Sequence, residues 1–356
     1  DGVLFGDKNE PLLFDPSVFI DDDGKQYLYF GIASLRDEKA KPLEKYSKDG
    51  CMVIELNPDM LTVTGEPRAV CPAKDQGKGT SFAGHEFYKS PSMRKWDGKY
   101  YFVYASALDY ELCYATSDNP LSGFTFGGTL IALGDLGEDG QEKPLNYLGD
   151  IDGSFLRIED KYYVFYHRHT NRNLYSRQIC AEEVRRRAGR FVQATMTSSG
   201  LSGRFLRGIG EYKARIACHL FSKKEPHAYG KRKLRRGNFP YFTQTGKDRN
   251  YTPAQHIANF GHGATAGFRY FFFDGANQII VTIKGNPRGK LIVSETPEGR
   301  AAAKIRLTPC KDFTDFYAPL RVHPGKQALY FTYEGTGKFI FKGFTLQQVA
   351  RGNKYE

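Results

Sequence analysis

The sequence predicts an all-β protein: a partial, N-terminally incomplete β-propeller followed by an antiparallel β-sandwich of the jelly-roll kind. Three observations predict it. A hairpin phrase occurs three times in the first half, the second half consists of short alternating strands, and the charge changes sharply between the halves. No apolar run among the 356 residues approaches the ~20 needed to cross a bilayer, so we expect a soluble protein with no membrane partner.

The repeated phrase reads "DPSVFIDDDGKQYLYFG" from Asp15, "DGKYYFVYAS" from Asp97 and "DGSFLRIEDKYYVFYHR" from Asp152. An acidic turn and a tyrosine-rich strand recur in it, which is typical of a β-hairpin. Recurrence of such hairpins at long intervals is typical of propeller blades, with a β-sandwich of chance similarity as the alternative. Three blades cannot close a ring of ~4–8. We therefore expect further blades before Asp1 or from another chain, and self-association if the ring is open.

The second half contains short alternating runs such as "QIIVTIKG" (278–285) and "GKLIVSET" (289–296), separated by Gly, Pro or Asn turns. This pattern predicts the sandwich. Residues 1–200 carry 24 basic and 30 acidic side chains, whereas the remainder carries 27 and 10. We place the propeller at 1–204 and the sandwich at 205–350. Only "AEEVRRRAG" (181–189) suggests a helix.

Cysteine spacing and charge exclude several classes of protein. The six cysteines form no CxxC pair, which argues against a zinc knuckle or a redox motif. They leave the compartment open between a bacterial cytoplasm and a secreted mature form. The basic insert from Ser222 to Phe242 could bind nucleic acid or an acidic glycan. No nucleic-acid fold surrounds it, so a solvated loop is favoured and a nucleic-acid partner is not.

Polar residues precede each repeated hairpin, where a propeller collects side chains around a central pocket. They are Asp15, the stretch "GHEFYKSPSMRK" (84–95) and the stretch "YLGDIDGSF" (147–155). Glycoside hydrolysis needs such acids, because one carboxylic acid protonates the leaving oxygen while one carboxylate activates water. A third carboxylate can raise the pKa of the acid through like-charge repulsion. This chemistry requires no cofactor.

On these phrases the chain resembles glycoside hydrolase family 43, whose five-bladed propellers include α-L-arabinofuranosidases and β-xylosidases. The sandwich resembles a carbohydrate-binding module of the family 6 type. The resemblance implies inverting hydrolysis of arabinose- or xylose-containing plant glycans, with carbohydrate as the partner. The alternative is a non-catalytic carbohydrate-binding protein or a degenerate fragment.

The resemblance assigns Asp15 to the auxiliary aspartate that tunes the acid's pKa; a turn-capping aspartate is the structural alternative. Lys89 stands where the family has its general-acid Glu, and an ammonium of ordinary pKa ~10.4 cannot act as a carboxylic acid. The family's base lies in a first blade that this chain would lack, so we expect impaired activity. Glu86 is a substitute acid only if a bulge turns it, because an odd offset on a strand points to the opposite face.

The resemblance also places His85, Asp152, His167 and Arg168 at the substrate. Asp152 replaces a histidine that the family often has, and it could hold a structural Ca²⁺ through oxygen ligands. We interpret His167 and its neighbour His169 as packing or substrate-rim residues, since no third metal ligand is evident. In the sandwich, the sugar-binding candidates are Tyr241, Tyr251 and Asn259. The single tryptophan, Trp96, belongs to the propeller.

Overall fold

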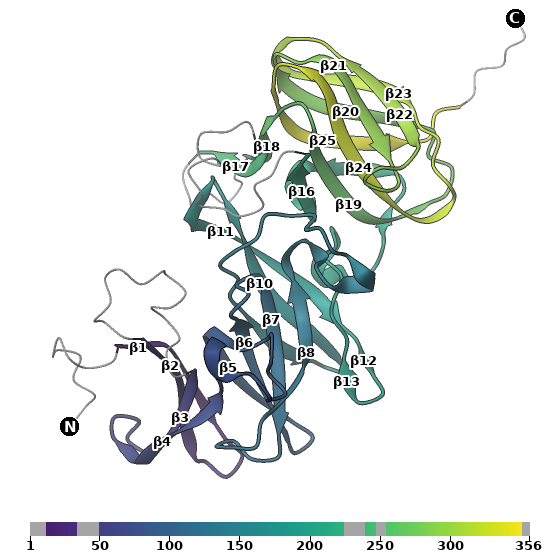
Figure 1. Ribbon diagram of the computed structural model, residues 1–356. Helices are drawn as coiled ribbons and strands as arrows, with labels where there is room; N and C mark the ends of the chain where they lie inside the picture. Colours follow the sequence, from purple (N-terminus) through teal and green to yellow (C-terminus); the bar gives the residue numbers. More distant parts are fainter. Residues whose placement is uncertain (1–11, 34–49, 224–238, 247–253, 351–356) are drawn as a thin grey trace, which may run out of the picture. The chain divides into compact units, whose positions relative to one another are not determined.

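The computed structural model describes residues 12–33, 50–223, 239–246 and 254–350 (Figure 1). The chain folds into two compact units. The first comprises Asp1–Leu133, Gly149–His167 and Ile179–Thr195, and the second comprises Gly134–Leu148, Arg168–Gln178 and Met196–Glu356. Three stretches before the predicted boundary thus group with the second unit: residues 134–148, 168–178 and 196–204. The single division of domains at 204/205 stays a prediction.

The all-β class is confirmed, because every regular element in the described residues is a strand or a three-residue 3₁₀ helix. No helix in these parts of the chain is long and apolar enough to span a membrane. The helix expected at 181–189 is wrong. Its residues continue a strand and form a short hairpin, because Glu182 and Val184 alternate with more exposed neighbours at the period of a β-strand.

The first unit contains three antiparallel sheets in sequence order, and the first hairpin of each contains one of the repeated phrases. The strands of the first sheet are β1 (Leu12–Ile20), β2 (Gln26–Ala33), β3 (Cys51–Leu56) and β4 (Val63–Cys71). Those of the second are β5 (Phe87–Trp96), β6 (Lys99–Ser106), β7 (Glu111–Ser117) and β8 (Thr125–Ala132). The third contains β9 (Gly153–Ile158), β10 (Lys161–Thr170) and β11 (Asn173–Val184), followed by the hairpin β12 (Arg186–Arg187) and β13 (Arg190–Phe191).

Turn chemistry and aromatic packing explain this arrangement. Asp97 and Gly98 both have positive φ, 54° and 75°, which is the geometry of a type I′ hairpin turn. Strand β5 lies beside β1 and beside β9, so the first strands of the three sheets are neighbours. The Trp96 ring lies 5.1 Å from the Phe155 ring and 6.2 Å from the Phe191 ring, which closes an aromatic core between the second and third sheets.

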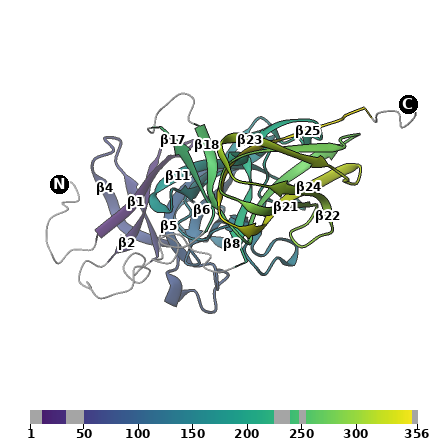
Figure 2. The ribbon, with the colours of Figure 1, turned by 90° about the horizontal axis from the view of Figure 1, so that it is seen from above.

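The second unit is a β-sandwich, as predicted (Figure 2). One sheet contains β14 (Leu206–Arg207), β16 (His219–Ser222), β19 (Ala264–Phe273), β21 (Arg288–Ser294), β22 (Ala301–Leu307) and β24 (Gly325–Thr336). The other contains β15 (Gly210–Lys213), β17 (Tyr241–Thr245), β18 (Ala254–Phe260), β20 (Gln278–Gly285), β23 (Cys310–Pro319) and β25 (Phe339–Gln347). Phe268 and Phe331 of the first sheet pack on Phe344 of the second, with ring centroids 4.8 and 4.7 Å apart. Most of the basic insert (224–238) lies outside the described residues.

Candidate functional site

The first strands of the three sheets, with the residues just before them, place equivalent tripeptides together. They read Asp15-Pro16-Ser17, Ser90-Pro91-Ser92 and Asp152-Gly153-Ser154. The backbone N–H of Ser90 donates to Oδ2 of Asp15 over 3.1 Å, and the Ser90 hydroxyl donates to Oδ1 of Asp152 over 2.5 Å. Hydrogen bonds therefore connect the first strands of three sheets at one point, as expected of blades around an axis.

Two β-bulges occur in the first strands of the first two sheets, next to these hydrogen bonds. Strand β1 loses register between Phe14 and Ser17, and β5 loses it between Lys89 and Ser92. Each interruption contains a proline, which cannot donate to the ladder. Bulges re-aim side chains and are common beside active sites. Here they turn Asp15 and the pair Lys89–Ser90 toward the same place.

Lys89 lies at the centre of the cluster. Its ammonium contacts Asp150, lies 3.2 Å from Oδ1 of Asp152 and lies 3.7 Å from Oδ1 of Asp109. The lysine side chain is 10% exposed, and the three carboxylates are about a quarter exposed. Asp109 comes from the turn between β6 and β7, and Asp150 from the loop before β9. We call Asp15, Lys89, Asp109, Asp150 and Asp152 the acid cluster.

Backbone strain coincides with the acid cluster. The φ angles of Asp15, Ser90, Asp109 and Asp150 are 50°, 58°, 60° and 51°, in the left-handed region that L-residues rarely adopt. Aspartate tolerates this region better than most residues, and serine is a less common occupant. Such conformations cost of order 1–3 kcal/mol each and concentrate at functional sites. The strain therefore marks the acid cluster as a candidate site independently of its charges.

Burial and charge set the protonation of the cluster. Partial burial raises the pKa of Asp15, and the nearby Asp152 adds to it, although the N–H of Ser90 opposes the shift. Burial also raises the pKa of Asp109, against the opposing charge of Lys89. For Lys89 burial favours the neutral amine, but the charges of Asp152, Asp109 and Asp150 outweigh it and raise the pKa. Lys89 is consequently a cation at neutral pH.

The oxygens of Asp150 and Asp152 do not fit a calcium ion in this arrangement. Ca²⁺ needs several oxygen ligands at once. The Lys89 ammonium already contacts both side chains, and two cations at one place repel each other. The structural Ca²⁺ predicted at Asp152 has no support from these contacts.

Glu86 and His85 lie in other surroundings. The Glu86 carboxylate accepts a hydrogen bond of 3.0 Å from the backbone N–H of Gly84, in the turn that precedes β5. The bulges in β5 follow Glu86 and therefore do not turn it toward Lys89. The Nδ1–H of His85 donates to Oε1 of Glu111 over 2.7 Å. Its predicted contact with substrate stays a prediction.

His167 and Arg168 follow each other on β10 and have different neighbours. A ring nitrogen of His167 lies within 4.8 Å of a carboxylate oxygen of Asp150, which brings this histidine to the acid cluster. Arg168 is buried in the second unit, where its guanidinium donates to the backbone oxygens of Ala217 and Arg215 and lies 3.7 Å from the centre of the Phe242 ring. His169 is buried as well. Arg168 therefore has structural partners, and its predicted contact with substrate stays a prediction.

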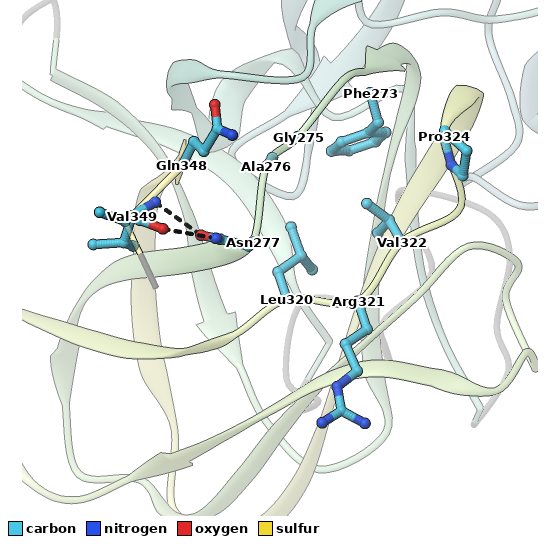
Figure 3. Close-up of a pocket in the computed structure, with 11 residues that line it drawn as sticks. Phe273, Gly275, Ala276, Asn277, Leu320, Arg321, Val322, Pro324, Gln348 and Val349 are labelled. Atoms are coloured by element: carbon cyan, nitrogen blue, oxygen red, sulfur yellow. Dashed lines mark hydrogen bonds between the residues drawn. The ribbon is translucent and has the colours of Figure 1, made fainter. Parts of the chain in front are cut away.

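Of the sugar candidates in the sandwich, Tyr241 lies 4.5 Å from the Arg172 guanidinium, and the Asn259 amide donates to the Phe239 oxygen over 2.9 Å. Tyr251 lies outside the described residues. The second unit has a cavity of about 830 Å³ at a different place (Figure 3). Its walls include Phe273, Leu320, Val322 and Pro324, with Arg321 and Asn277 as polar members. Neither Tyr241 nor Asn259 lines it.

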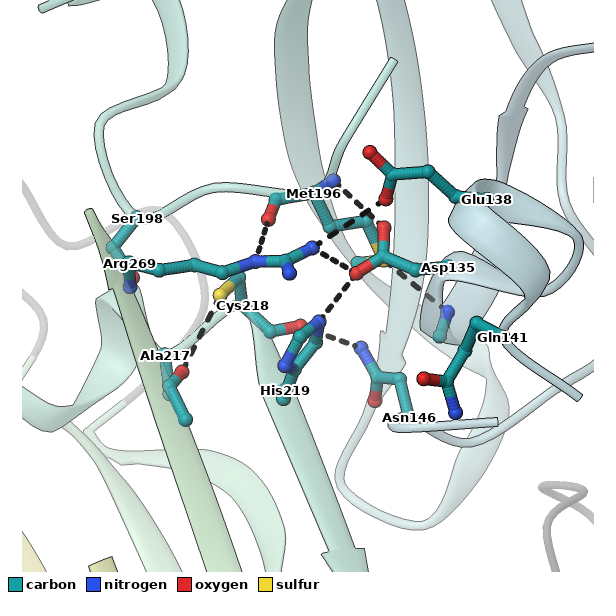
Figure 4. Close-up of polar contacts among 12 residues, drawn as sticks. Asp135, Glu138, Gln141, Asn146, Met196, Ser198, Ala217, Cys218, His219 and Arg269 are labelled. Atoms are coloured by element: carbon teal, nitrogen blue, oxygen red, sulfur yellow. Dashed lines mark hydrogen bonds and ion pairs between the residues drawn. The ribbon is translucent and has the colours of Figure 1, made fainter. Parts of the chain in front are cut away.

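A second polar cluster lies within the second unit (Figure 4). The Asp135 carboxylate contacts Arg269 and lies 2.6 Å from Nε2 of the fully buried His219. Burial would raise the pKa of Asp135, but the bond to His219 and the charge of Arg269 hold it below its usual range. Burial lowers the pKa of His219. Burial and the nearby charge of Asp135 raise the pKa of Glu138 to about 7.

Sequence reasoning missed Asp109 and Asp150. Asp150 is part of the quoted stretch "YLGDIDGSF", two residues before Asp152, so an acidic pair ahead of the third hairpin was visible. Asp109 follows the strand "KYYFVYAS" in a turn closed by its own N–H to the Ser106 oxygen. Nothing in the sequence near Asp109 distinguishes it from an ordinary turn aspartate.

An all-β chain that gathers carboxylates from successive sheets at one position has the design of a glycoside hydrolase, whose chemistry depends on carboxyl groups. The family model "Glycosyl hydrolases family 43" matches residues 4–191. A "Xylosidase/arabinosidase" of Thermoclostridium stercorarium is 39% identical over 352 residues, which cover 97% of this chain and 72% of the relative. The chain belongs to glycosyl hydrolase family 43.

Other likenesses cover less. A "Xylosidase/arabinosidase" of Bacteroides ovatus is 35% identical over 33% of this chain and 40% of its own length. Among solved structures, an arabinoxylan arabinofuranohydrolase of Bacillus subtilis in complex with cellotetraose is similar at 18% identity and a TM-score of 0.44, over 95% of this chain and 67% of that one. CsCBM6-3 from Clostridium stercorarium, in complex with cellobiose, is similar at 11% identity and a TM-score of 0.32, over 41% and 99%.

Proposed function

We propose that this protein acts on α-L-arabinofuranosides or β-xylosides of plant glycans by inverting hydrolysis, and that Lys89 limits the activity of this chain. One observation carries the proposal: position 89 is surrounded by Asp109, Asp150 and Asp152. A carboxyl group in such a place has a raised pKa, because like charges disfavour its ionised form. A raised pKa is what a general acid needs near neutral pH.

In this chain, the same three charges act on an ammonium instead. They stabilise the cation, so Lys89 holds its proton where the reaction would require its release to the leaving oxygen. Asp15 retains the place of the modulator, and its raised pKa follows from burial and from Asp152. The site therefore has the surroundings of a proton donor without the donor.

Substitution of Lys89 by Glu and by Gln tests the proposal. We would measure cleavage of arabinoxylan and xylan oligosaccharides, whose leaving alcohols need protonation, with and without azide as an external nucleophile. Azide makes the result independent of the catalytic base. We expect Lys89→Glu to raise the rate at least 10-fold over the unchanged protein, in the range of general-acid effects. Lys89→Gln removes the positive charge without supplying an acid, so it should not raise the rate. Equal rates for both variants would refute the assignment of position 89.

The alternative function is non-catalytic carbohydrate binding. The ion pairs of Lys89 favour it, because they occupy the acid cluster with a stable cation. Calorimetry with arabinoxylan oligosaccharides would distinguish the two functions. Binding by the unchanged protein without any gain of hydrolysis in Lys89→Glu supports the alternative.

A further inference from the structure

Three side chains of the types that bind metal ions meet at one end of the second sheet. His85 directly precedes β5, and Glu111 and Cys113 are the first and third residues of β7. Residues two apart on a strand share a face, so Glu111 and Cys113 point the same way. Nδ1 or Nε2 of His85, a carboxylate oxygen of Glu111 and Sγ of Cys113 all lie within 4.8 Å of one another. None of these residues belongs to the acid cluster, and none is assigned to proton transfer in the proposed hydrolysis.

Neighbouring groups hold two of the three side chains in place. The Ser106 hydroxyl donates to Oε1 of Glu111 over 2.7 Å, and the Thr129 hydroxyl donates to Oε2 over 2.9 Å. The His85 ring stacks on Phe126, with centroids 4.4 Å apart and planes 10° apart. Outer partners of this kind orient metal ligands and are a regular part of metal sites. The geometry is therefore prepared before any ion arrives.

The donor set selects the class of ion. Thiolate and imidazole are ligands of zinc and similar late transition metals, whereas calcium and magnesium take oxygen ligands. We propose that His85, Glu111 and Cys113 bind one divalent cation of the zinc class. The His85 side chain is 34% exposed, while that of Glu111 is 5% exposed. The ion enters on the histidine side, where water supplies the fourth ligand of a tetrahedral site.

Binding rearranges protons without any redox step. The Cys113 thiol releases its proton to solvent as the sulfur–metal bond forms, and the His85 ring binds as a neutral imidazole. The 2.7 Å contact between Nδ1 of His85 and Oε1 of Glu111 is replaced by two bonds to the metal. The ion would then fix the start of β7, two residues after Asp109, and so steady the turn that brings Asp109 to the acid cluster.

Cobalt and zinc titrations test the site in the full chain. The metal-depleted protein should bind one equivalent of Co²⁺ with a thiolate charge-transfer band in the ultraviolet, and Zn²⁺ should abolish the band by displacement. Elemental analysis after dialysis should find one zinc per chain. Cys113→Ser and His85→Gln should each weaken binding at least 10-fold. His85 is partly exposed, so its substitution tests the site even if Cys113→Ser fails to fold.

Two control variants separate this site from other metal-binding groups. Cys218→Ser removes a buried thiol of the second unit and should leave the cobalt band unchanged. Asp150→Asn alters the acid cluster and should also leave it unchanged. No equimolar zinc in the unchanged protein, or undiminished binding by folded His85→Gln, would overturn the proposal. Loss of binding in Asp150→Asn would instead assign the ion to the acid cluster and equally overturn it.

Discussion

The ammonium of Lys89 lies 3.2 Å from Oδ1 of Asp152, and so joins the first strand of the second sheet to the residue that directly precedes the third. Asp150 and Asp109 contact the same ammonium. In a family of hydrolases whose chemistry depends on carboxyl groups, this chain thus holds a cation at the centre of its carboxylates. The presence of lysine instead of a carboxylic acid at position 89 has measurable consequences for stability as well as for activity.

Replacement of Lys89 by Met should destabilise the fold at pH 7, because it leaves three carboxylates without a counter-charge. We expect a loss of about 2 kcal/mol, less than for a fully buried pair, since the carboxylates retain some contact with water. Repulsion raises the pKa of these carboxyls in the folded variant, so acidification neutralises them and the loss shrinks. Urea denaturation at pH 7 and pH 5 measures the change. Lys99→Met, at a half-exposed lysine of the same sheet, should cost under ~0.5 kcal/mol. An equal loss at both pH values would contradict the account.

Asp21 stabilises the contact between the first two sheets. Burial would raise its pKa, but hydrogen bonds from Lys95, Tyr100 and the backbone of Asp22 hold it below the usual range. This lowered folded pKa contributes stability that is present above the pKa of an unfolded aspartate and is lost as pH falls through the folded value. Asp21→Asn should therefore cost about 1–2 kcal/mol at pH 7, with a smaller gap from wild type below pH ~4.

The control for Asp21 is Asp22→Asn. The Asp22 side chain is 85% exposed, so its replacement should change the free energy of unfolding by under ~0.5 kcal/mol. Denaturant titrations of both variants at pH 7 and pH 3 provide the comparison. A gap for Asp21→Asn that widens in acid would show that the carboxylate is not held in its ionised form.

Glu138 makes the second unit sensitive to pH. Its pKa in the folded protein is about 7, against an ordinary value of 4.5, so the folded state keeps a proton that the unfolded state releases. The corresponding stability is fully present below pH 4.5 and is lost as pH rises through 7. Glu138→Gln carries no ionisable group at this position and therefore does not lose this stability. We expect the melting temperature of Glu138→Gln minus that of wild type to be larger at pH 8 than at pH 5. Thermal unfolding at the two pH values checks it, with the exposed Glu142→Gln as a control that should follow wild type.

Arg168→Lys should destabilise the protein by about 2–4 kcal/mol. Lysine cannot reproduce the planar fork that reaches the Ala217 and Arg215 oxygens and covers the Phe242 ring. The exposed Arg177 of the same hairpin provides the matched control, and Arg177→Lys should change stability little. Urea denaturation measures both variants. If Arg168→Lys is as stable as wild type but binds sugar more weakly, Arg168 contacts the substrate and its structural role is contradicted.

Much of the fold could be predicted from local sequence. Asp97-Gly98 specifies a tight turn, and the tyrosine-rich strands after Lys25, Lys99 and Lys161 form the predicted hairpins. Such signals are local, because turn type and strand alternation depend on neighbouring residues. Residues 181–189 were expected to form a helix because they are rich in charged residues, but the alternation of buried and more exposed side chains at 181–184 is that of a β-strand.

The acid cluster could be predicted only in part. Asp15, Lys89 and Asp152 were visible because each begins or precedes a repeated hairpin. Asp109 could not be predicted, because β-bulges that are not evident from the sequence decide which side chains of neighbouring sheets meet. Arg168 follows His167 on β10, and consecutive strand residues point to opposite faces. Its partners Ala217 and Arg215 lie far along the chain, so local sequence could not indicate them.

The pH dependence of cleavage by Lys89→Glu, measured in the presence of azide with an arabinoxylan oligosaccharide whose leaving alcohol needs protonation, tests the central claim most directly. The account predicts that kcat/KM falls as pH rises through a pKa well above the ~4.3 of an ordinary glutamate, because Asp109, Asp150 and Asp152 raise it. Adding Asp152→Asn should lower that pKa. A rate that does not respond to pH above 4, or a pKa unmoved by Asp152→Asn, would contradict the claim that these carboxylates prepare position 89 for a proton donor.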